Sequence, residues 1–583
     1  MSDIVTALLT AQTRQEEVRS SFEAGMQAAF NWVNPRRYDM TGTATKGAIR
    51  KTKMYDGVAQ DAFLTWVEGI MGWFVGQSLD WQRASIGSIT GIPWGRAREI
   101  RENDEVQEYL QSYTEAMRFE LNSSTFYDIE NEWLQDLGSA GTGVIVTEES
   151  QDMSHSVLRV PHPGRYWIDW DSDYKIDVYH ERVTMTARQC WQKYRKPGDT
   201  LHPTIEKWAK DPNSAGWEVT LLQCIRPSTD PIFESRVKWS PYVLVTLVDQ
   251  FNGGTGAATQ DTDLQDNSKR LIRIQPLSRF TPTVCRLRTN SDELYGYSQA
   301  MDIMSVIEAV QQHGYNLANM GNHAADPTRF IPDEKRGKWS FLPGATNTYG
   351  QEKRIAYTMP TGGDYPIAID REDKLHSLIR SRYGYPLWNM MPMFQAKKER
   401  VQATEISEAR VDQARLLSGQ TGNIWKGITS MYDAIAGFAG VAGRLPEPPA
   451  ILQDLTGRDV VVVRPMGTLA QLQEFAANVS GLQQGLRFLS EIAEITGRHV
   501  SPKMAAQLYH RVNLPDLAEF ALDATGFPQR LMRSDEDVAS RIARDDQMEQ
   551  AAAQAQNAQR VAAASAQLGK PMDDSSLMAG AMG

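Results

Sequence analysis

Hydrophobic and polar positions divide the chain into stretches with a helical period and stretches with a strand period. Residues 1 to about 135 mostly follow the helical period. A helix is predicted within residues 119–137, ended by Gly138, because apolar side chains recur along one face. Its candidate capping residues are Asn122, Ser123 and Ser124, and its predicted apolar face comprises Phe126, Ile129, Trp133, Leu134 and Leu137.

From residue 141 the pattern changes to that of β-strands. Alternating or β-branched runs, separated by Pro, Gly and Asp turns, are typical of antiparallel strands. The predicted strands occupy residues 141–149, 156–171, 175–186, 217–226, 237–251 and 271–275. The Gly-rich polar stretch 253–268 predicts a surface loop.

From Tyr295 the helical period returns. A helix over 297–320 is predicted from one seam with steps of 4, 3, 4 and 3, formed by Ile303, Ile307, Val310, Gly314 and Leu317. A Gly- and Pro-rich segment with possible strands, 328–366, precedes a second helix over 369–383. Leu375, Leu378 and Ile379 are predicted on one side of that helix. Taken alone, this pattern also fits an ordinary helical hairpin with a β insert.

The last third of the chain is predicted to be mainly helical. A long polar helix is predicted over 404–438, and a short strand, 459–464, precedes helices that continue to about residue 521. The Ala- and Gln-rich end, 534–583, has high helix propensity but few large apolar residues to bury. It is interpreted as a solvated or bundle-forming helix, or as a disordered tail.

Composition narrows the classes of protein. A chain of 583 residues is too long for one compact core, and 41% hydrophobic residues suffice for several. The formal net charge of −11 disfavours tight, sequence-specific binding of duplex DNA, whose affinity comes mostly from Lys and Arg. The same negative charge would suit a surface past which DNA moves without binding. The apolar stretch 63–79 is short for a membrane span and contains Glu68, so a buried amphipathic helix is predicted and no membrane partner.

The residues offer no recognisable catalytic or cofactor chemistry. The three cysteines, Cys190, Cys224 and Cys285, are far apart, which disfavours a zinc ribbon or a disulfide framework and favours assembly in a reducing cytosol. There is no P-loop, G-x-S-x-G or H-E-x-x-H motif. The histidines in the strand region lack metal-ligand spacing and are interpreted as surface or hydrogen-bonded structural residues; they are His155, His162 and His180. No catalytic residue, metal or cofactor is therefore predicted.

Five segments, taken in order, resemble the head-to-tail connector, or portal, family of short-tailed bacteriophages. They include a Tyr-Asp helix start, a Phe-Tyr helix that leads into a strand, a strand pair ending in M-T-x-x-Q, a Tyr-Gly helix start and an A-T-E-I helix. The segments are 54–83, 123–149, 161–194, 293–312 and 402–410. The chain has Ser-Thr before Phe126 and lacks the family's usual Ala after Thr404. Residues beyond about 440 lie outside the resemblance.

The resemblance implies an α+β, mostly helical portal fold with wing, stem, clip and crown parts. The implied divisions are 1–294 wing, 295–326 first stem helix, 327–366 clip, 367–384 second stem helix, 385–403 tunnel loop, 404–440 long wing helix, 441–533 crown and 534–583 C-terminal helix or tail. Twelve such subunits would form a ring at one capsid vertex of the virion, after assembly in the host cytoplasm. The implied partners are the major capsid and scaffolding proteins, the terminase motor, a tail adaptor and non-specific double-stranded DNA in the channel.

Two groups of residues are candidate contact sites on this resemblance. Flexible Met side chains and nearby cations in the tunnel segment could touch passing DNA; they are Met390, Met391, Met393, Lys397, Lys398 and Arg400. Prolines 386 and 392 prevent a continuous helix there. A Met-rich core edge followed by a solvated helix start is the alternative interpretation.

The clip segment carries a basic patch with interleaved aromatic residues. Its predicted partner-docking residues are Arg329, Lys335, Arg336, Lys338, Trp339, Phe341, Lys353 and Arg354. A solvated loop is the alternative interpretation.

The function that the resemblance implies is a non-enzymatic, ring-shaped conduit for DNA packaging, retention and ejection that docks the packaging motor and the tail. Two alternatives remain: a nucleic-acid-processing enzyme of a mobile element, and a capsid scaffold or internal virion protein.

Overall fold

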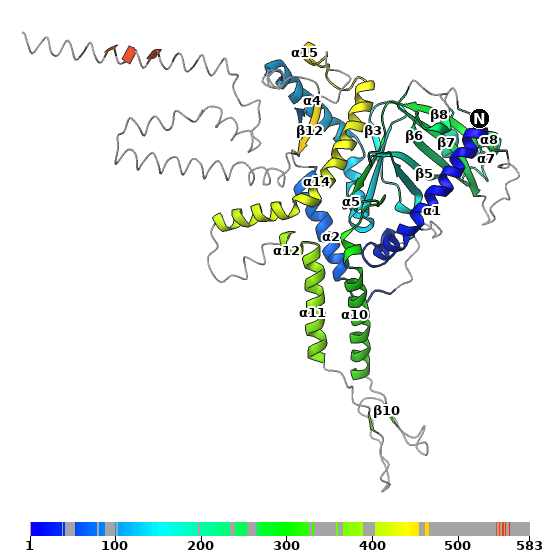
Figure 1. Ribbon diagram of the computed structural model, residues 1–583, viewed down its shortest axis with the longest axis vertical. Helices are drawn as coiled ribbons and strands as arrows, with labels where there is room; N and C mark the ends of the chain where they lie inside the picture. The colour runs from blue at the N-terminus through cyan, green and yellow to red at the C-terminus, as the bar shows by residue number, and fades with distance from the viewer. Residues whose placement is uncertain are drawn as a thin grey trace, which may run out of the picture. The chain divides into compact units, whose positions relative to one another are not determined.

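The chain folds as two compact units, Met1–Asn478 and Val479–Gly583. The computed structural model describes residues 2–37, 39–40, 53–77, 81–87, 100, 103–195, 199–233, 240–252, 264, 266–325, 329–330, 357–358, 365–388, 403–453, 461–465 and scattered helical positions between 541 and 559. The first unit combines helices with antiparallel sheets (Figure 1). The predicted α+β class is confirmed, whereas most of the segment beyond 465 lies outside the described residues.

A five-stranded antiparallel sheet forms the larger β layer, with strand order β4-β5-β6-β7-β8. Its strands are β4 (Tyr166–Trp170), β5 (Ile176–Thr186), β6 (Glu218–Pro227), β7 (Tyr242–Asn252) and β8 (Leu271–Leu277). Each coincides largely with a predicted strand, because runs of β-branched, aromatic and other apolar residues between turn residues favour strands. Neighbouring strands in the sheet are also consecutive in the chain, so the sheet is a simple meander.

A second, three-stranded sheet has the order β3-β2-β9 and consists of β3 (Ser156–Arg159), β2 (Thr142–Glu149) and β9 (Pro282–Arg286). The pairing of β9 with β2 places Cys285 opposite Gly143 and was not predicted. β1 (Gln82–Ile86), also not predicted, pairs with β12 (Val461–Pro465) and so joins two distant parts of the first unit. These pairings depend on partners far away in the sequence.

Helices surround the two sheets. α1 runs along the five-stranded sheet, while α5 and α14 lie against the three-stranded one (Figure 1). The helices are α1 (Ser2–Trp32), α2 (Val58–Ile70), α4 (Asp104–Ser123), α5 (Phe126–Ala140), α6 (Ala187–Lys193), α7 (Pro203–Lys210), α8 (Asn267–Arg270), α9 (Gln299–Asp302), α10 (Met304–Ala325), α11 (Tyr365–Arg382), α12 (Tyr385–Trp388), α14 (Ala403–Val441) and α15 (Ala450–Gln453). Short turns of other helix types are η1 (Pro35–Arg37), η2 (Met71–Val75), η3 (Pro163–Arg165) and η4 (Pro231–Phe233).

The end of α5 corrects one prediction. Gly138 does not stop the helix, which continues to Ala140 and is capped by Gly141 in the left-handed conformation, with φ of 77°. Gly138 instead allows the helix to pack closely against Trp66, since a Cβ atom at this position would lie 2.5 Å from the Trp66 ring. The predicted apolar face is otherwise confirmed: Trp133 and Leu137 are fully buried.

The largest hydrophobic core gathers α2, α4, α5, α10, α11 and α14, with Trp66, Trp81 and Trp133 at its centre. α2 buries Phe63 and Trp66 in this core, as predicted for the 63–79 stretch. Among the described residues, no helix is both long enough and apolar enough to span a membrane. Within this core α2 packs against α11, and α11 in turn packs against α10.

Candidate functional site

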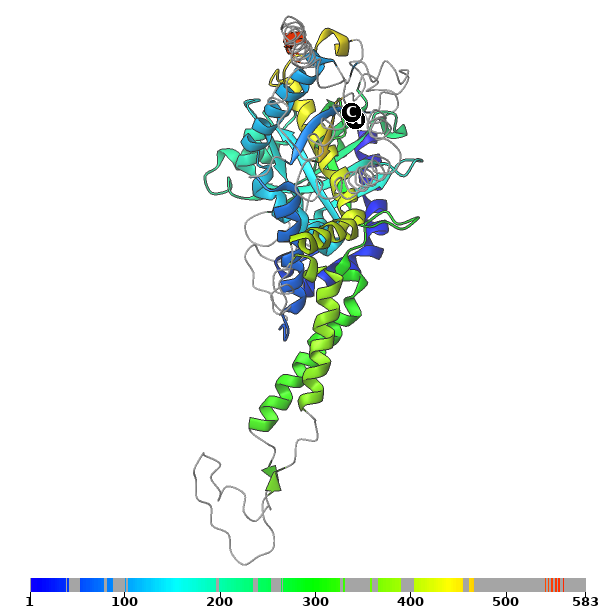
Figure 2. The same cartoon turned by 90° about the vertical axis from the view of Figure 1, so that its left-hand side faces the viewer.

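Helices α10 and α11 lie side by side and run away from the two sheets (Figures 1 and 2). Beyond their far ends the chain pairs again, because β10 (Arg329–Phe330) and β11 (Tyr357–Thr358) are antiparallel neighbours. This antiparallel unit, here called the helix pair, is the most distinctive part of the first unit. Among the described residues, a helix, a short strand pair and a returning helix follow one another in the predicted order.

The predicted seam of α10 is present in the structure. Ile307 and Val310 are buried, and Gly314 allows close approach of the backbone at Tyr55, since a Cβ there would lie 3.2 Å from the Tyr55 Cβ. The helix differs from the prediction at its start. Ser298 caps a separate short helix, α9, and the chain breaks at Ile303 before α10 begins.

The three apolar residues predicted on one side of α11 differ in burial. Ile379 is fully buried and Leu375 is half-buried, whereas Leu378 remains 56% exposed. Residues 375, 379 and 383 recur at helical spacing and turn one narrow face toward the core, whereas residue 378 is rotated away from it by about one residue step. Leu378 therefore belongs to the free surface of the helix pair.

A buried glutamine anchors α10 to the segment that precedes α2. The Oε1 atom of Gln311 accepts hydrogen bonds from the backbone N–H groups of Tyr55 at 2.9 Å and Asp56 at 3.3 Å. Its Nε2 atom donates to the Asp56 carbonyl oxygen at 2.6 Å. The Tyr55 and Tyr315 rings also pack edge to face, with centroids 5.1 Å apart. Because both ends of one side-chain amide are used, the segment is held in a single register on α10.

A second set of contacts lies closer still to the core, where α10 begins and α11 ends. Asp302, just before α10, accepts from Arg288 at 2.5 Å and from Arg382 at the end of α11. Tyr383 is buried against Phe63 of α2. Gly384 then takes a left-handed conformation, with φ of 65°, and ends α11. The base of the helix pair is thus tied to the core by charge and by packing.

On the outer faces of the helix pair, several apolar side chains remain exposed to solvent in the single chain. On α11, Ile367 is 66% and Leu378 is 56% exposed. They lie eleven residues apart, about three helical turns, so they share a face with the exposed Arg371 and Lys374. We name this face, residues 367, 371, 374 and 378, the α11 stripe.

A corresponding stripe runs along α10. It consists of Glu308, Gln312, Tyr315 and Asn322, all exposed, at similar helical spacing. Tyr315 is 41% exposed although it is aromatic. We name these four residues the α10 stripe. The α10 stripe carries the carboxylate of Glu308. The α11 stripe carries the cations Arg371 and Lys374, and Lys374 also pairs with Asp370 of the same helix at 2.6 Å.

Nearly all of the contact residues predicted from the sequence lie outside the described residues. This holds for the whole tunnel group, Met390, Met391, Met393, Lys397, Lys398 and Arg400. It holds for the clip group except Arg329, whose backbone lies in β10: Lys335, Arg336, Lys338, Trp339, Phe341, Lys353 and Arg354. Both groups remain predictions. Pro386 does lie at the start of a new helix, α12, after the break at Gly384.

The cysteines and histidines of the strand region form no catalytic arrangement within the described part of the chain. All three cysteines are buried, and burial raises the pKa of each thiol to about 12. His180 lies between Gln12 Oε1 and the Arg226 guanidinium, each at 2.9 Å, and His162 accepts from the Gly164 N–H. The interpretation of these histidines as hydrogen-bonded structural residues is confirmed.

Two buried carboxyl groups with perturbed pKa values were not predicted. Burial raises the pKa of Asp136 to about 7, against the opposing effect of Arg37, which forms a bidentate ion pair with it. Burial raises the pKa of Glu130 to about 8, and that side chain is only 4% exposed. Both lie on α5 inside the first unit, so we assign them to the core and not to a site of chemistry. Nothing in the local sequence distinguishes them from surface carboxylates.

The structure also contains a cavity of about 380 Å³ between β2, the five-stranded sheet and the end of α14. Its lining is mainly apolar, with Tyr179, Leu244 and Phe438 among the contributing side chains.

Comparison with known proteins agrees with the order of these elements. The sequence model of the family described as bacteriophage head to tail connecting protein matches residues 6–532, nearly the whole chain. A comparison with curated proteins finds no match.

Proposed function

The chain belongs to the bacteriophage head to tail connecting proteins, and on that premise we propose that it forms the ring-shaped channel through which DNA is packaged, retained and ejected. Membership gives the chain a portal-type structural role and a place in the virion capsid. The ring, the DNA path and the docking of the motor and tail are parts of the proposal.

The observation that carries this proposal is the free surface of the helix pair. A lone subunit leaves Ile367, Leu378 and Tyr315 in water, although burying them would be favourable. In a ring, the α11 stripe of one subunit would face the α10 stripe of its neighbour. Glu308 would then lie near Arg371 and the Lys374–Asp370 ion pair, and the apolar side chains would be buried.

The dimensions of the helix pair suit a channel wall. α10 has 22 residues, which corresponds to about 33 Å of helix. Gln311 and Asp302 hold its base against the core, so copies of the pair would keep one orientation around the axis. We propose that α10 and α11 are the two stem helices and that β10 and β11 begin the clip.

The remaining parts of the proposal follow the sequence predictions. Residues 385–403 would form the tunnel loop, and the basic and aromatic residues of 329–354 would dock the terminase motor and then the tail adaptor. The first 294 residues and 404–440 would form the wing, and 441–533 the crown. Twelve subunits would surround the DNA, with the major capsid and scaffolding proteins as outer partners.

One experiment tests whether the tunnel segment acts on DNA. Replacing Lys397, Lys398 and Arg400 together by alanine should leave assembly intact but lower the amount of DNA retained after packaging, because three cations facing phosphates are lost. A matched control replaces Arg371 and Lys374 on α11 by alanine, which should affect assembly instead. Retention equal to that of the parent protein would remove the three residues from the DNA path.

The competing hypothesis of a nucleic-acid-processing enzyme is tested with the pure chain and Mg²⁺. We expect neither nuclease nor ATPase activity. A robust activity that disappears on substitution of one carboxylate would replace the portal proposal with the enzymatic one.

A further inference from the structure

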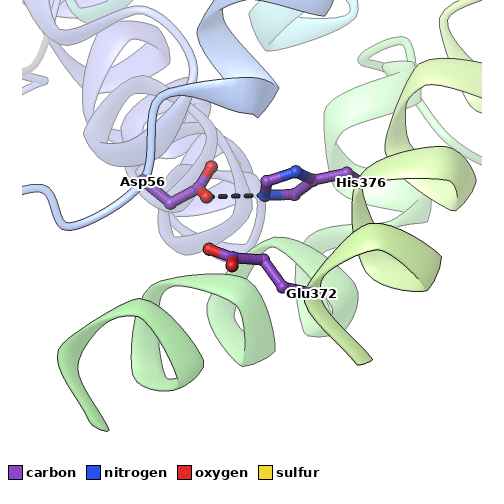
Figure 3. A group of neighbouring side chains, drawn as sticks. All are labelled: Asp56, Glu372 and His376. Atoms are coloured by element: carbon purple, nitrogen blue, oxygen red, sulfur yellow. Dashed lines mark hydrogen bonds and ion pairs between the residues drawn. The ribbon is translucent and has the colours of Figure 1, made fainter. Parts of the chain in front are cut away.

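Three potential metal ligands meet where α11 packs on the segment before α2. Figure 3 shows Glu372 and His376 extending from α11 toward Asp56. One ligand atom from each lies within 4.8 Å of the other two. The His376 Nε2 atom is 2.6 Å from the Asp56 Oδ2 atom. Glu372 and His376 are four residues apart, which places both on one face of the helix.

We propose that Asp56, Glu372 and His376 bind one divalent transition-metal ion, with Zn²⁺ bound more tightly than Mn²⁺. Two carboxylates and one imidazole form a mixed oxygen and nitrogen donor set, which suits these ions. Ca²⁺ and Mg²⁺ prefer ligand sets made of oxygen alone. Water would complete the coordination, since three protein ligands leave positions open.

The charges around the cluster support a cation. Two carboxylates lie together with one imidazole, and among the described residues no lysine or arginine forms an ion pair with Asp56 or Glu372. Asp56 is well shielded, with 9% of its side chain exposed, and His376 has 22%. A divalent ion would compensate both negative charges in a partly desolvated place, where uncompensated charge is costly.

The Asp56 ligand is already held in position. Its Oδ1 atom accepts a hydrogen bond from the Val58 N–H at 2.8 Å, and its backbone is fixed by Gln311. Only Oδ2 is directed at the cluster. Outer hydrogen bonds of this kind orient first-sphere ligands in metal sites.

Small side-chain movements would complete the geometry. A tetrahedral ion with bonds near 2.1 Å separates its ligand atoms by roughly 3.4 Å. Asp56 and His376 would therefore move slightly apart as the ion enters between them, and Glu372 would move closer. The ion would join α11 to the segment that Gln311 ties to α10, so it would lock the base of the helix pair.

The test is titration of Zn²⁺, and separately of Mn²⁺ and Mg²⁺, into the chelator-treated full chain, followed by isothermal calorimetry. We expect one Zn²⁺ per chain, weaker binding of Mn²⁺ and no comparable binding of Mg²⁺. Glu372→Gln and His376→Gln should each weaken Zn²⁺ binding at least tenfold. Asp373→Asn is the matched control, because it removes a carboxylate from the next, exposed position of the same helix and should leave binding unchanged.

The outcomes are distinguishable. Absence of one-per-chain binding, or equal effects of Glu372→Gln and Asp373→Asn, would overturn the site. Glu372 makes no hydrogen bond or ion pair among the described residues, so Glu372→Gln tests the ligand without a direct threat to folding. Binding is counted per chain, and its result stands whether or not the chains assemble into rings.

Discussion

Replacing Ile367 and Leu378 by serine should weaken the contact between neighbouring subunits without unfolding the chain. The two side chains are 66% and 56% exposed, so the subunit itself gains little from them. Fully burying a Leu or Ile side chain contributes about 1.5–3 kcal/mol. The exposed fractions of the two residues together then correspond to about 2–4 kcal/mol for each subunit interface.

That loss should lower the association constant per interface roughly 30- to 1,000-fold, since about 1.4 kcal/mol is a factor of ten. Every subunit of a closed ring makes this contact on both sides, so the concentration needed for rings should rise steeply. Sedimentation velocity over a dilution series measures that concentration. The control is Asp373→Ser with Ser377→Ala, both exposed and off the α11 stripe. Assembly of the Ile367 and Leu378 variant at the parent concentration would refute the assigned interface.

Two further predictions concern the first unit itself. Between pH 4.5 and about 8 the unfolded chain loses the Glu130 proton while the folded chain keeps it, so stability should fall by up to about 1.4 kcal/mol per pH unit as the pH rises through this window. Glu130→Gln should flatten that fall and stabilise the protein at pH 8 in thermal unfolding scans, and an unchanged pH profile would contradict the buried, neutral carboxyl. Gln311→Leu should lower the free energy of unfolding in urea by about 2–3 kcal/mol, because three hydrogen bonds to residues 55 and 56 are lost. Gln312→Leu, on the exposed face, should lower it little. Equal effects of the two substitutions would show that Gln311 does not anchor the helix pair.

Local periodicity was sufficient to predict most elements. The strands β4 to β8 are runs of β-branched and aromatic residues bounded by turn residues, and the seam through Ile307 and Val310 repeats at helical spacing, so both were visible in the residue order. β1 and β9 have only five residues each, and their partners lie far away in the chain. A run of five residues is too short to show a clear strand period, so these two strands could not be predicted without knowledge of their partners.

Contacts between segments that are far apart in the chain could not be predicted from the sequence. Glu372 and His376 share a helix face that spacing could have shown, but nothing in the sequence places Asp56 beside them. Leu375, Leu378 and Ile379 were predicted on one side of α11, but the sequence does not show how much of that side meets the core, and Leu378 lies on the part that does not. Gly138 and Gly141 were indistinguishable as helix stops until φ showed which one is left-handed.

Cryo-electron microscopy of the purified full chain tests the central claim most directly. Closed rings with an axial hole, in which α10 of one subunit faces α11 of the next and Tyr315 and Leu378 are buried, are the expected result. Single subunits at every concentration, or rings in which the helix pair points away from the axis, would contradict the account.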